Sequence, residues 1–105
     1  MVKKTSPEKL RPVHPGEILK EDFMDPLNMT SANLAHDLDV PANRISQILQ
    51  GKRSITVDTA LRLERYFKVS AEFWLNLQKD FDLEMGKDLL WGKIQQDVKP
   101  TPRVA

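Results

Sequence analysis

The 105-residue sequence predicts an all-α domain of five helices, with a possible short sixth helix near the C-terminus. Apolar residues recur at three- and four-residue intervals along most of the chain, as on one face of an α-helix, and almost no segment alternates like a strand. Helix-capping residues, prolines and a glycine separate the periodic segments. The chain is long enough to bury a core as one domain without disulfides or metal.

The first two helices are bounded by prolines and a capping threonine. The first is expected from about Gly16 to Asp25, led in by Pro15 and ended by Pro26, with an apolar stripe of Ile18, Leu19 and Phe23. Thr30 can cap the second helix by accepting a backbone N–H of its first turn. That helix runs to about Leu38 and would bury Leu34, Ala35 and Leu38.

The later helices follow the same logic. The third starts near Pro41, since proline is tolerated in a first turn, and ends at Gly51. Thr56 caps the fourth, whose apolar residues are Leu61, Leu63, Tyr66 and Phe67. Ser70 caps the fifth, in which aromatic and aliphatic residues recur at Phe73, Trp74, Leu77 and Phe81. A sixth is expected over residues 87–96.

Charge is partitioned along the chain although the formal net charge is only +1. The sums over Lys, Arg, Asp and Glu are +3 for residues 1–13, −5 for 14–40, +3 for 41–57, −2 for 58–85 and +2 for 86–105. No apolar run approaches the length of a membrane span, and no signal peptide opens the chain. We therefore expect no membrane partner. The absence of cysteine from the sequence fits a reducing compartment, and we expect a cytoplasmic protein.

A helix-turn-helix pattern lies within residues 31–48. Its apolar and small residues are spaced for two crossing helices, at Leu34, Ala35, Leu38, Val40, Ile45 and Ile48. Ala35 is small where the helices cross at close range. The turn position needs a positive φ and is usually glycine; here it is Asp39, one of the few side chains that tolerates this conformation.

The exposed side of the second of these helices suits DNA. Opposite Ile45 and Ile48 lie three amides, Asn43, Gln47 and Gln50, and amides can bond the N6/N7 edge of adenine. Arg44 lies on the flank, where it could reach guanine or phosphate. Phosphate contacts are expected from the loop and helix start that follow, at Lys52, Arg53, Ser54 and Thr56. Residues 40–55 contain no acid. The alternative is an ordinary solvated polar face.

Other residues indicate no enzyme or cofactor. His14 is expected to form local structure before the first helix and His36 to lie on the surface, and two histidines without a third ligand do not predict a metal site. No nucleophile with a base, and no glycine-rich loop, indicates catalysis or nucleotide binding. We expect no catalytic residue, no cofactor and no metal; Phe73, Trp74, Leu77 and Phe81 would form core or a dimer seam.

Four motifs resemble the HigA (VapI) family of bacterial antitoxins, within the phage-repressor-like helix-turn-helix group: "HPGEIL", "VPANRISQILQGKRSIT", "DTALRLERYF" and "EFWLNLQ". The resemblance covers roughly residues 14–83. It implies a five-helix homodimer that represses its own promoter at a palindromic operator of double-stranded DNA. It also implies neutralisation of a RelE-like toxin that cleaves messenger RNA on the ribosome.

The resemblance also implies roles for individual residues. Base contacts map onto Ala42, Asn43, Arg44 and Gln47, and phosphate contacts onto Lys52 and Arg53. The full set of phosphate contacts that we expect is Ser31, Gln50, Lys52, Arg53, Ser54 and Thr56. Ser31 stands where the family often carries a longer glutamine, and Asn28 and Asp39 stand where glycine is common. The dimer interface would use Phe73, Trp74, Leu77 and Phe81.

Together these features divide the chain into four parts: a flexible arm over 1–13, the DNA-binding and dimerisation domain over 14–85, a helical extension over 86–98 and a flexible tail over 99–105. The acidic residues from Glu17 to Asp39 could dock a basic toxin, because opposite potentials speed encounter. Three alternatives stay open: a stand-alone repressor without a toxin, a toxin-binding module that does not read DNA, and a small hydrolase.

Overall fold

The computed structural model describes residues 11–103, and these are helical or irregular with no strand. The helices in chain order are α1 (Pro15–Ile18), η3 (Leu19–Met24), η4 (Asp25–Leu27), α2 (Ser31–Leu38), α3 (Ala42–Leu49), α4 (Val57–Phe67), α5 (Ala71–Gly86), η5 (Lys87–Trp91) and α6 (Gly92–Asp97). The all-α prediction is therefore confirmed. Most of the arm predicted over 1–13, and the last two residues of the tail, lie outside the described residues. No helix within 11–103 is long and apolar enough to cross a membrane.

The first helical segment continues past the expected stop at Pro26. Here α1 passes into a π-helical turn, η3, and then into the 3-10 turn η4. Pro26 lies near the start of that 3-10 turn, where its missing N–H leaves no bond unmade. The chain instead leaves the helix at Asn28, which has φ 53°. A residue that tolerates the left-handed region thus ends the segment, and not the proline.

The helix-turn-helix pair forms as the sequence predicts. Thr30 caps α2 by accepting the N–H of Asn33 at 3.0 Å, while the Asn33 side chain accepts the N–H of Thr30. Asp39 has φ 59° and ends α2, and its N–H bonds back to Ala35 and His36 carbonyls. Ala35 is buried between the helices. The tight turn sets the direction in which α3 leaves.

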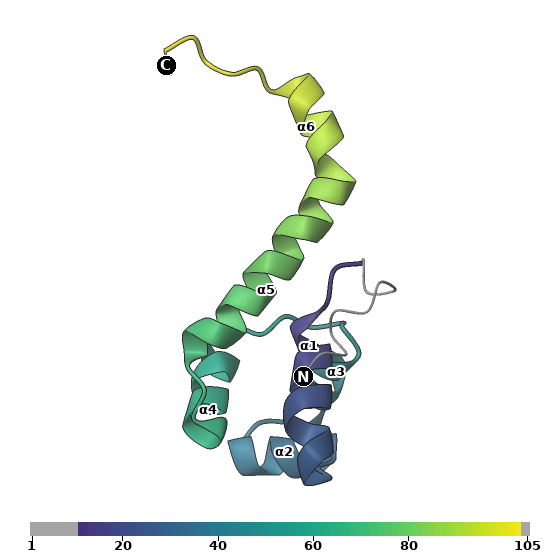
Figure 1. Cartoon of the computed structure of the whole chain (residues 1–105), viewed down its shortest axis with the longest axis vertical. Helices are drawn as coiled ribbons and strands as arrows, with labels where there is room; N and C mark the ends of the chain where they lie inside the picture. The colour runs from purple at the N-terminus through teal and green to yellow at the C-terminus, as the bar shows by residue number, and fades with distance from the viewer. Residues whose placement is uncertain (1–10, 104–105) are drawn as a thin grey trace.

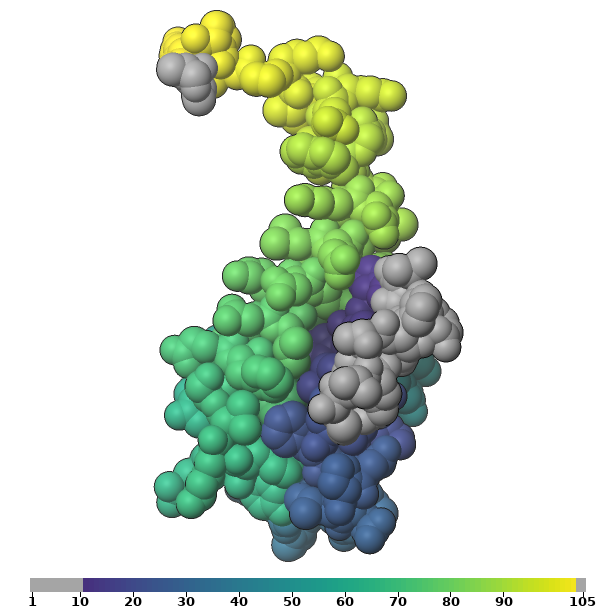
Figure 2. Space-filling model, viewed as in Figure 1, coloured from purple at the N-terminus to yellow at the C-terminus, as the bar shows by residue number. Residues whose placement is uncertain are grey.

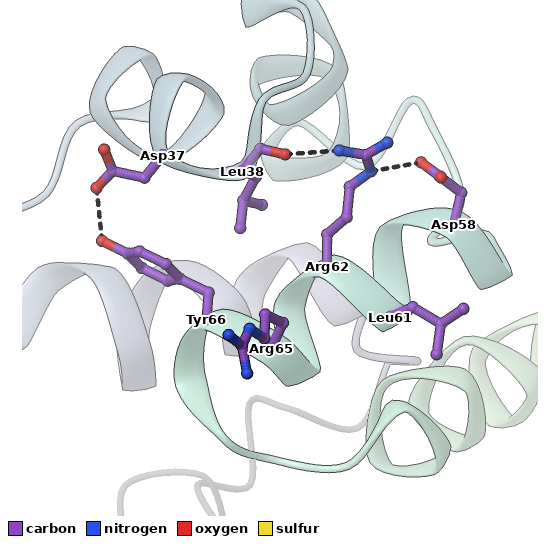
Figure 3. A pocket seen from close by; sticks show the side chains of 7 residues that line it. All are labelled: Asp37, Leu38, Asp58, Leu61, Arg62, Arg65 and Tyr66. Atoms are coloured by element: carbon purple, nitrogen blue, oxygen red, sulfur yellow. Dashed lines mark hydrogen bonds and ion pairs between the residues drawn. The ribbon is translucent and has the colours of Figure 1, made fainter.

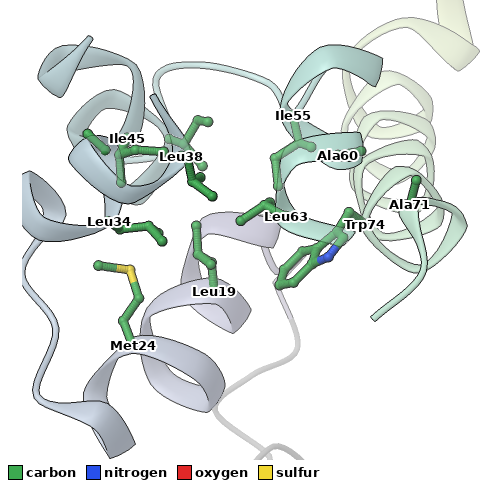
Figure 4. Packing of buried hydrophobic residues seen from close by; sticks show 12 residues of the cluster. Leu19, Met24, Leu34, Leu38, Ile45, Ile55, Ala60, Leu63, Ala71 and Trp74 are labelled. Atoms are coloured by element: carbon green, nitrogen blue, oxygen red, sulfur yellow. The ribbon is translucent and has the colours of Figure 1, made fainter. Parts of the chain in front are cut away.

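The core lies between η3, α2, α3, α4 and the start of α5 (Figures 1 and 4). Its buried apolar residues are Leu19, Met24, Leu34, Ala35, Leu38, Ile45, Ile48, Ile55, Ala60, Leu63, Ala71 and Trp74. Ile45 and Ile48 of α3 are wholly buried in it. The opposite side of α3 is therefore held outward by packing.

A close contact joins α1 to α3. A Cβ on Gly16 would lie 2.0 Å from the carbonyl oxygen of Ile48, so only glycine fits where the two backbones meet. His14 caps α1: its Nδ1 accepts the N–H of Gly16 at 2.9 Å. Its ring is buried and meets the ring of Phe81 edge-on, with centroids 4.9 Å apart. The expectation of local structure at His14 is confirmed.

The C-terminal helices leave the body of the molecule. From Ser70, whose side chain caps α5, the chain stays helical through α5, η5 and α6 to Asp97. The predicted sixth helix is present and continues α5 without an intervening loop. Figure 2 shows this extension standing away from the packed helices, and its side chains from Lys87 onward are exposed.

Candidate nucleic-acid interface

The surface of α3 that faces away from the core carries the predicted amides. Asn43 and Gln50 are exposed, and Gln47 is half-buried. Pro41 precedes the helix with extended backbone, so its ring costs α3 no hydrogen bond. The side chains of Ala42 and Asn43 project from the first turn, which is the part of a recognition helix that reaches deepest into a major groove.

The segment after α3 forms an exposed basic loop, Lys52, Arg53 and Ser54. It begins at Gly51, whose φ of 76° turns the chain. It ends at Thr56, which caps α4 by accepting the N–H of Thr59 at 3.4 Å. The structure thus places two cations and the N-terminus of an 11-residue helix next to α3, a combination suited to phosphate.

Gln78 fixes the far side of this loop and was not singled out by the sequence. Its side chain is buried on α5. Its Oε1 accepts the N–H of Ile55 at 2.8 Å, and its Nε2 donates to Asp82 at 3.0 Å. Because the bond to Ile55 joins residues 23 positions apart in the sequence, no local pattern predicts it. It holds the start of α4 against α5.

Two of the predicted base-contacting residues are already paired. The Nε of Arg53 donates to Oε1 of Gln47 at 2.9 Å. Arg44, with 26% of its side chain exposed, donates to the carboxylate of Asp58 in the first turn of α4. Residues 40–55 contain no acid in the sequence, but in the folded chain the carboxylate of Asp58 lies against Arg44.

Asp58 and Arg62 were also missed by the sequence reading. Arg62 donates from Nε to Asp58 at 3.0 Å and from Nη1 to the carbonyl of Leu38 at 2.9 Å (Figure 3). Hydrogen bonds from Arg62 and then Arg44 hold the pKa of Asp58 below its usual value, so it is charged at neutral pH. Only the Asp58 and Arg62 pair, at an i,i+4 spacing, could have been found from sequence.

Beside this pair lies an open pocket of about 530 Å³ between the end of α2 and α4. Figure 3 shows its lining residues: Asp37, Leu38, Asp58, Leu61, Arg62, Arg65 and Tyr66. Tyr66 donates its hydroxyl to Asp37 at 2.6 Å, which lowers the pKa of that carboxyl and raises that of the phenol. The contact joins α2 to the C-terminal end of α4.

Other predicted site residues lie outside this group. Ser31 is half-buried and is the first residue of α2. It therefore belongs neither to α3 nor to the basic loop that follows α3. Among the proposed interface residues Trp74 is wholly buried in the core, the first of the two roles that its spacing allowed. Phe73 is 36% exposed, while Leu77 and Phe81 are half-buried. The face of α5 thus divides between core and surface.

His36 is exposed, as expected, and its Nδ1 lies 3.4 Å from the carboxylate of Asp37. Within residues 11–103 no group of three His, Cys, Asp or Glu side chains is arranged to hold a metal ion.

Comparison with known proteins gives one family model and several relatives. The Helix-turn-helix model matches residues 20–74, more than half of the chain. Virulence-associated protein I of Dichelobacter nodosus is 47% identical over 75 residues, which are 71% of this chain and 69% of that protein.

Solved structures that resemble this protein cover most of the chain. An addiction module antidote protein of the HigA family from Coxiella burnetii superposes with a TM-score of 0.81 at 47% identity, covering 88% of this chain and 100% of that one. Antitoxin HigA of Pseudomonas aeruginosa, solved with the higBA promoter, has a TM-score of 0.83 at 39% identity, over 86% of this chain and 98% of that one.

Proposed function

Because this chain belongs to the HigA family of helix-turn-helix proteins, we propose that it is an antitoxin that binds double-stranded DNA and represses its own promoter. The observation that carries this proposal is the outward face of α3, where Asn43 and Gln47 stand beside the basic loop. Amides can read base edges, and the loop cations can hold the flanking phosphates. A cytoplasmic location follows from this function.

A homodimer would make the operator palindromic. Two copies of α3 about 34 Å apart would enter successive major grooves on one side of the duplex. Of the residues that we assigned to the seam, Phe73 has the most accessible surface. We propose that Phe73 and Leu77 take part in the contact, with Trp74 supporting them from the core.

DNA binding is tested by titrating the full chain with a labelled duplex from upstream of its gene and with a scrambled duplex of the same composition. We expect tighter binding to the upstream duplex and weakening with salt, because each neutralised phosphate releases a counterion. Arg44→Ala should weaken the upstream complex by about 1 to 3 kcal/mol. Equal, salt-independent binding to both duplexes would contradict the proposal.

We further propose that the partner is a RelE-like toxin docked on the acidic surface between Glu17 and Asp39. Asp25 is exposed and paired with Lys20 at 3.1 Å, and opposite potentials would favour a basic partner. The test is co-expression with the product of the small reading frame beside the gene, followed by co-purification and growth rescue.

The docking surface is tested separately from the toxin partnership. Asp25→Lys should reduce co-purification, whereas Asp97→Lys, which removes a similarly exposed acid paired with a lysine, should not. Equal retention of the toxin by both variants would exclude this surface. No toxin, but intact operator binding, would identify a stand-alone repressor.

A further inference from the structure

One carboxylate connects the recognition helix to the turn of the helix-turn-helix. Asp58 Oδ2 accepts from Arg44 of α3 and from Nε of Arg62, which lies one turn further along α4. Arg62 in turn donates to the carbonyl of Leu38 at 2.9 Å (Figure 3) and to that of Asp39 at 3.3 Å. A movement of Arg44 that turns its Nη1 toward DNA therefore breaks a contact that is anchored elsewhere in the fold.

The position of this carboxylate opposes binding to phosphate. Asp58 lines a cleft of about 280 Å³ together with Arg44, Arg53, Thr56 and Arg62. This cleft opens at the start of α4, where the proposed function puts the DNA backbone. A phosphate entering it meets the negative charge of Asp58, and Arg44 is already occupied. A weak, sequence-independent contact gains little by displacing that pair.

Resting on the proposed DNA-binding function, we propose that Asp58 is a specificity-determining residue, which withholds Arg44 from arbitrary DNA and releases it only to the operator. At the operator, Arg44 can exchange the carboxylate for a bidentate contact to guanine. At other sequences it stays with Asp58. The carboxylate thus lowers affinity for unrelated DNA more than affinity for the operator.

The test compares Asp58→Asn with the wild type on the upstream duplex and on the scrambled duplex, over a series of salt concentrations. We expect affinity for the scrambled duplex to rise by about two- to fivefold, the range that loss of one exposed ion pair allows. Operator affinity should change less, so that the ratio of the two falls. The salt slope on scrambled DNA should steepen by about one phosphate contact.

Asp37→Asn is the matched control. It makes the same change of charge at a carboxylate that also accepts a hydrogen bond, from Tyr66 at the opposite end of α4 from Asp58. The control should leave the ratio of affinities at the wild-type value. A rise on scrambled DNA equal to that of Asp58→Asn would reduce the effect to net charge and overturn the proposal.

Arg44→Ala separates a direct from an indirect role. If Asp58 acts mainly through Arg44, the effect of Asp58→Asn on scrambled-DNA affinity should shrink once Arg44 is alanine. An undiminished effect in that background would overturn the proposal. Asp58→Glu, which keeps the charge, should keep wild-type discrimination and so assign the effect to the carboxylate. If the wild type itself binds no DNA, the proposed function fails; if it binds and Asp58→Asn matches it, only this inference fails.

Discussion

Arg53 and Gln47 are joined by a hydrogen bond that fixes what the recognition helix offers to a base. Since arginine can only donate, the oxygen of the Gln47 amide must face Arg53 and its NH₂ group must face outward. The Arg53 and Gln47 pair therefore presents N–H donors to a base edge. This favours a base edge made of acceptors, the N7 and O6 of guanine, over adenine, which needs a donor and an acceptor together.

We expect operators with guanine opposite Gln47 to bind best, and Arg53→Ala to shift the preference there toward adenine by freeing the amide oxygen. Competition among duplexes substituted at each position measures both effects. Lys52→Ala is the control, because it removes a neighbouring exposed cation without touching Gln47 and should weaken all duplexes alike. A preference for adenine in the wild type would show that the pair opens on binding.

His14 should make stability depend on pH below neutrality. Burial lowers the pKa of its imidazole, partly opposed by the charges of Asp82 and Glu17. In the unfolded chain the pKa returns to about 6.5, so the unfolded state binds more protons as pH falls through that value. The stability is present above that pH and is progressively lost below it, as protonation of Nδ1 removes the cap on Gly16.

Urea unfolding at about pH 7.5 and at about pH 5.5 measures this loss of stability. Both pH values lie above the usual pKa values of carboxyl groups. His14→Asn keeps a side chain that can cap a helix but cannot titrate, and it should flatten the dependence. His36→Asn, at an exposed histidine, should leave the dependence unchanged. A slope that survives His14→Asn and disappears in His36→Asn would contradict the assignment.

Two glycines should respond to alanine with opposite signs. Gly16→Ala places Cβ against the carbonyl of Ile48, and neither backbone can give way cheaply, so we expect a loss of about 1 to 3 kcal/mol in the free energy of unfolding. Gly86→Ala meets nothing within 4 Å and lies inside a helix, so it should gain about 0.5 to 1 kcal/mol. Chemical denaturation of the two variants measures both changes in the free energy of unfolding. Equal changes would contradict the close contact between Gly16 and Ile48.

Local patterns predicted the helices and their caps, but not the contacts between distant side chains. Thr30, Thr56 and Ser70 cap as expected because a cap depends on only three or four neighbouring residues. Lys68 ends α4 at φ 62°, a left-handed conformation that a lysine in the sequence does not predict. The N–H of Lys68 bonds the carbonyl of Glu64 and so closes the end of α4.

In the candidate site, periodicity placed Asn43 and Gln47 on the outward face of α3 but could not say what they touch. The partners of Arg44 and of Ile55 lie 14 and 23 residues away. Such pairs depend on how whole helices pack, which one sequence does not reveal. The same limit applies at Trp74: spacing alone put it on the apolar face of α5, yet could not separate core from seam.

Trp74→Ala distinguishes a core residue from an interface residue. Trp74 is fully buried against Phe23, with ring centroids 4.8 Å apart, so its truncation should cost about 3 to 5 kcal/mol of folding free energy. Trp74→Phe should cost less and stay folded, so that assembly can be measured. For this variant we expect lower stability and a wild-type association constant by sedimentation.

Phe73→Ala should give the opposite pattern. Its ring is 36% exposed, so truncation removes less buried surface within the chain and more of any surface shared between copies. We expect a smaller loss of stability than for Trp74→Ala and weaker association. If Trp74→Phe kept wild-type stability but sedimented as a monomer where the wild type is a dimer, the indole would belong to the seam after all.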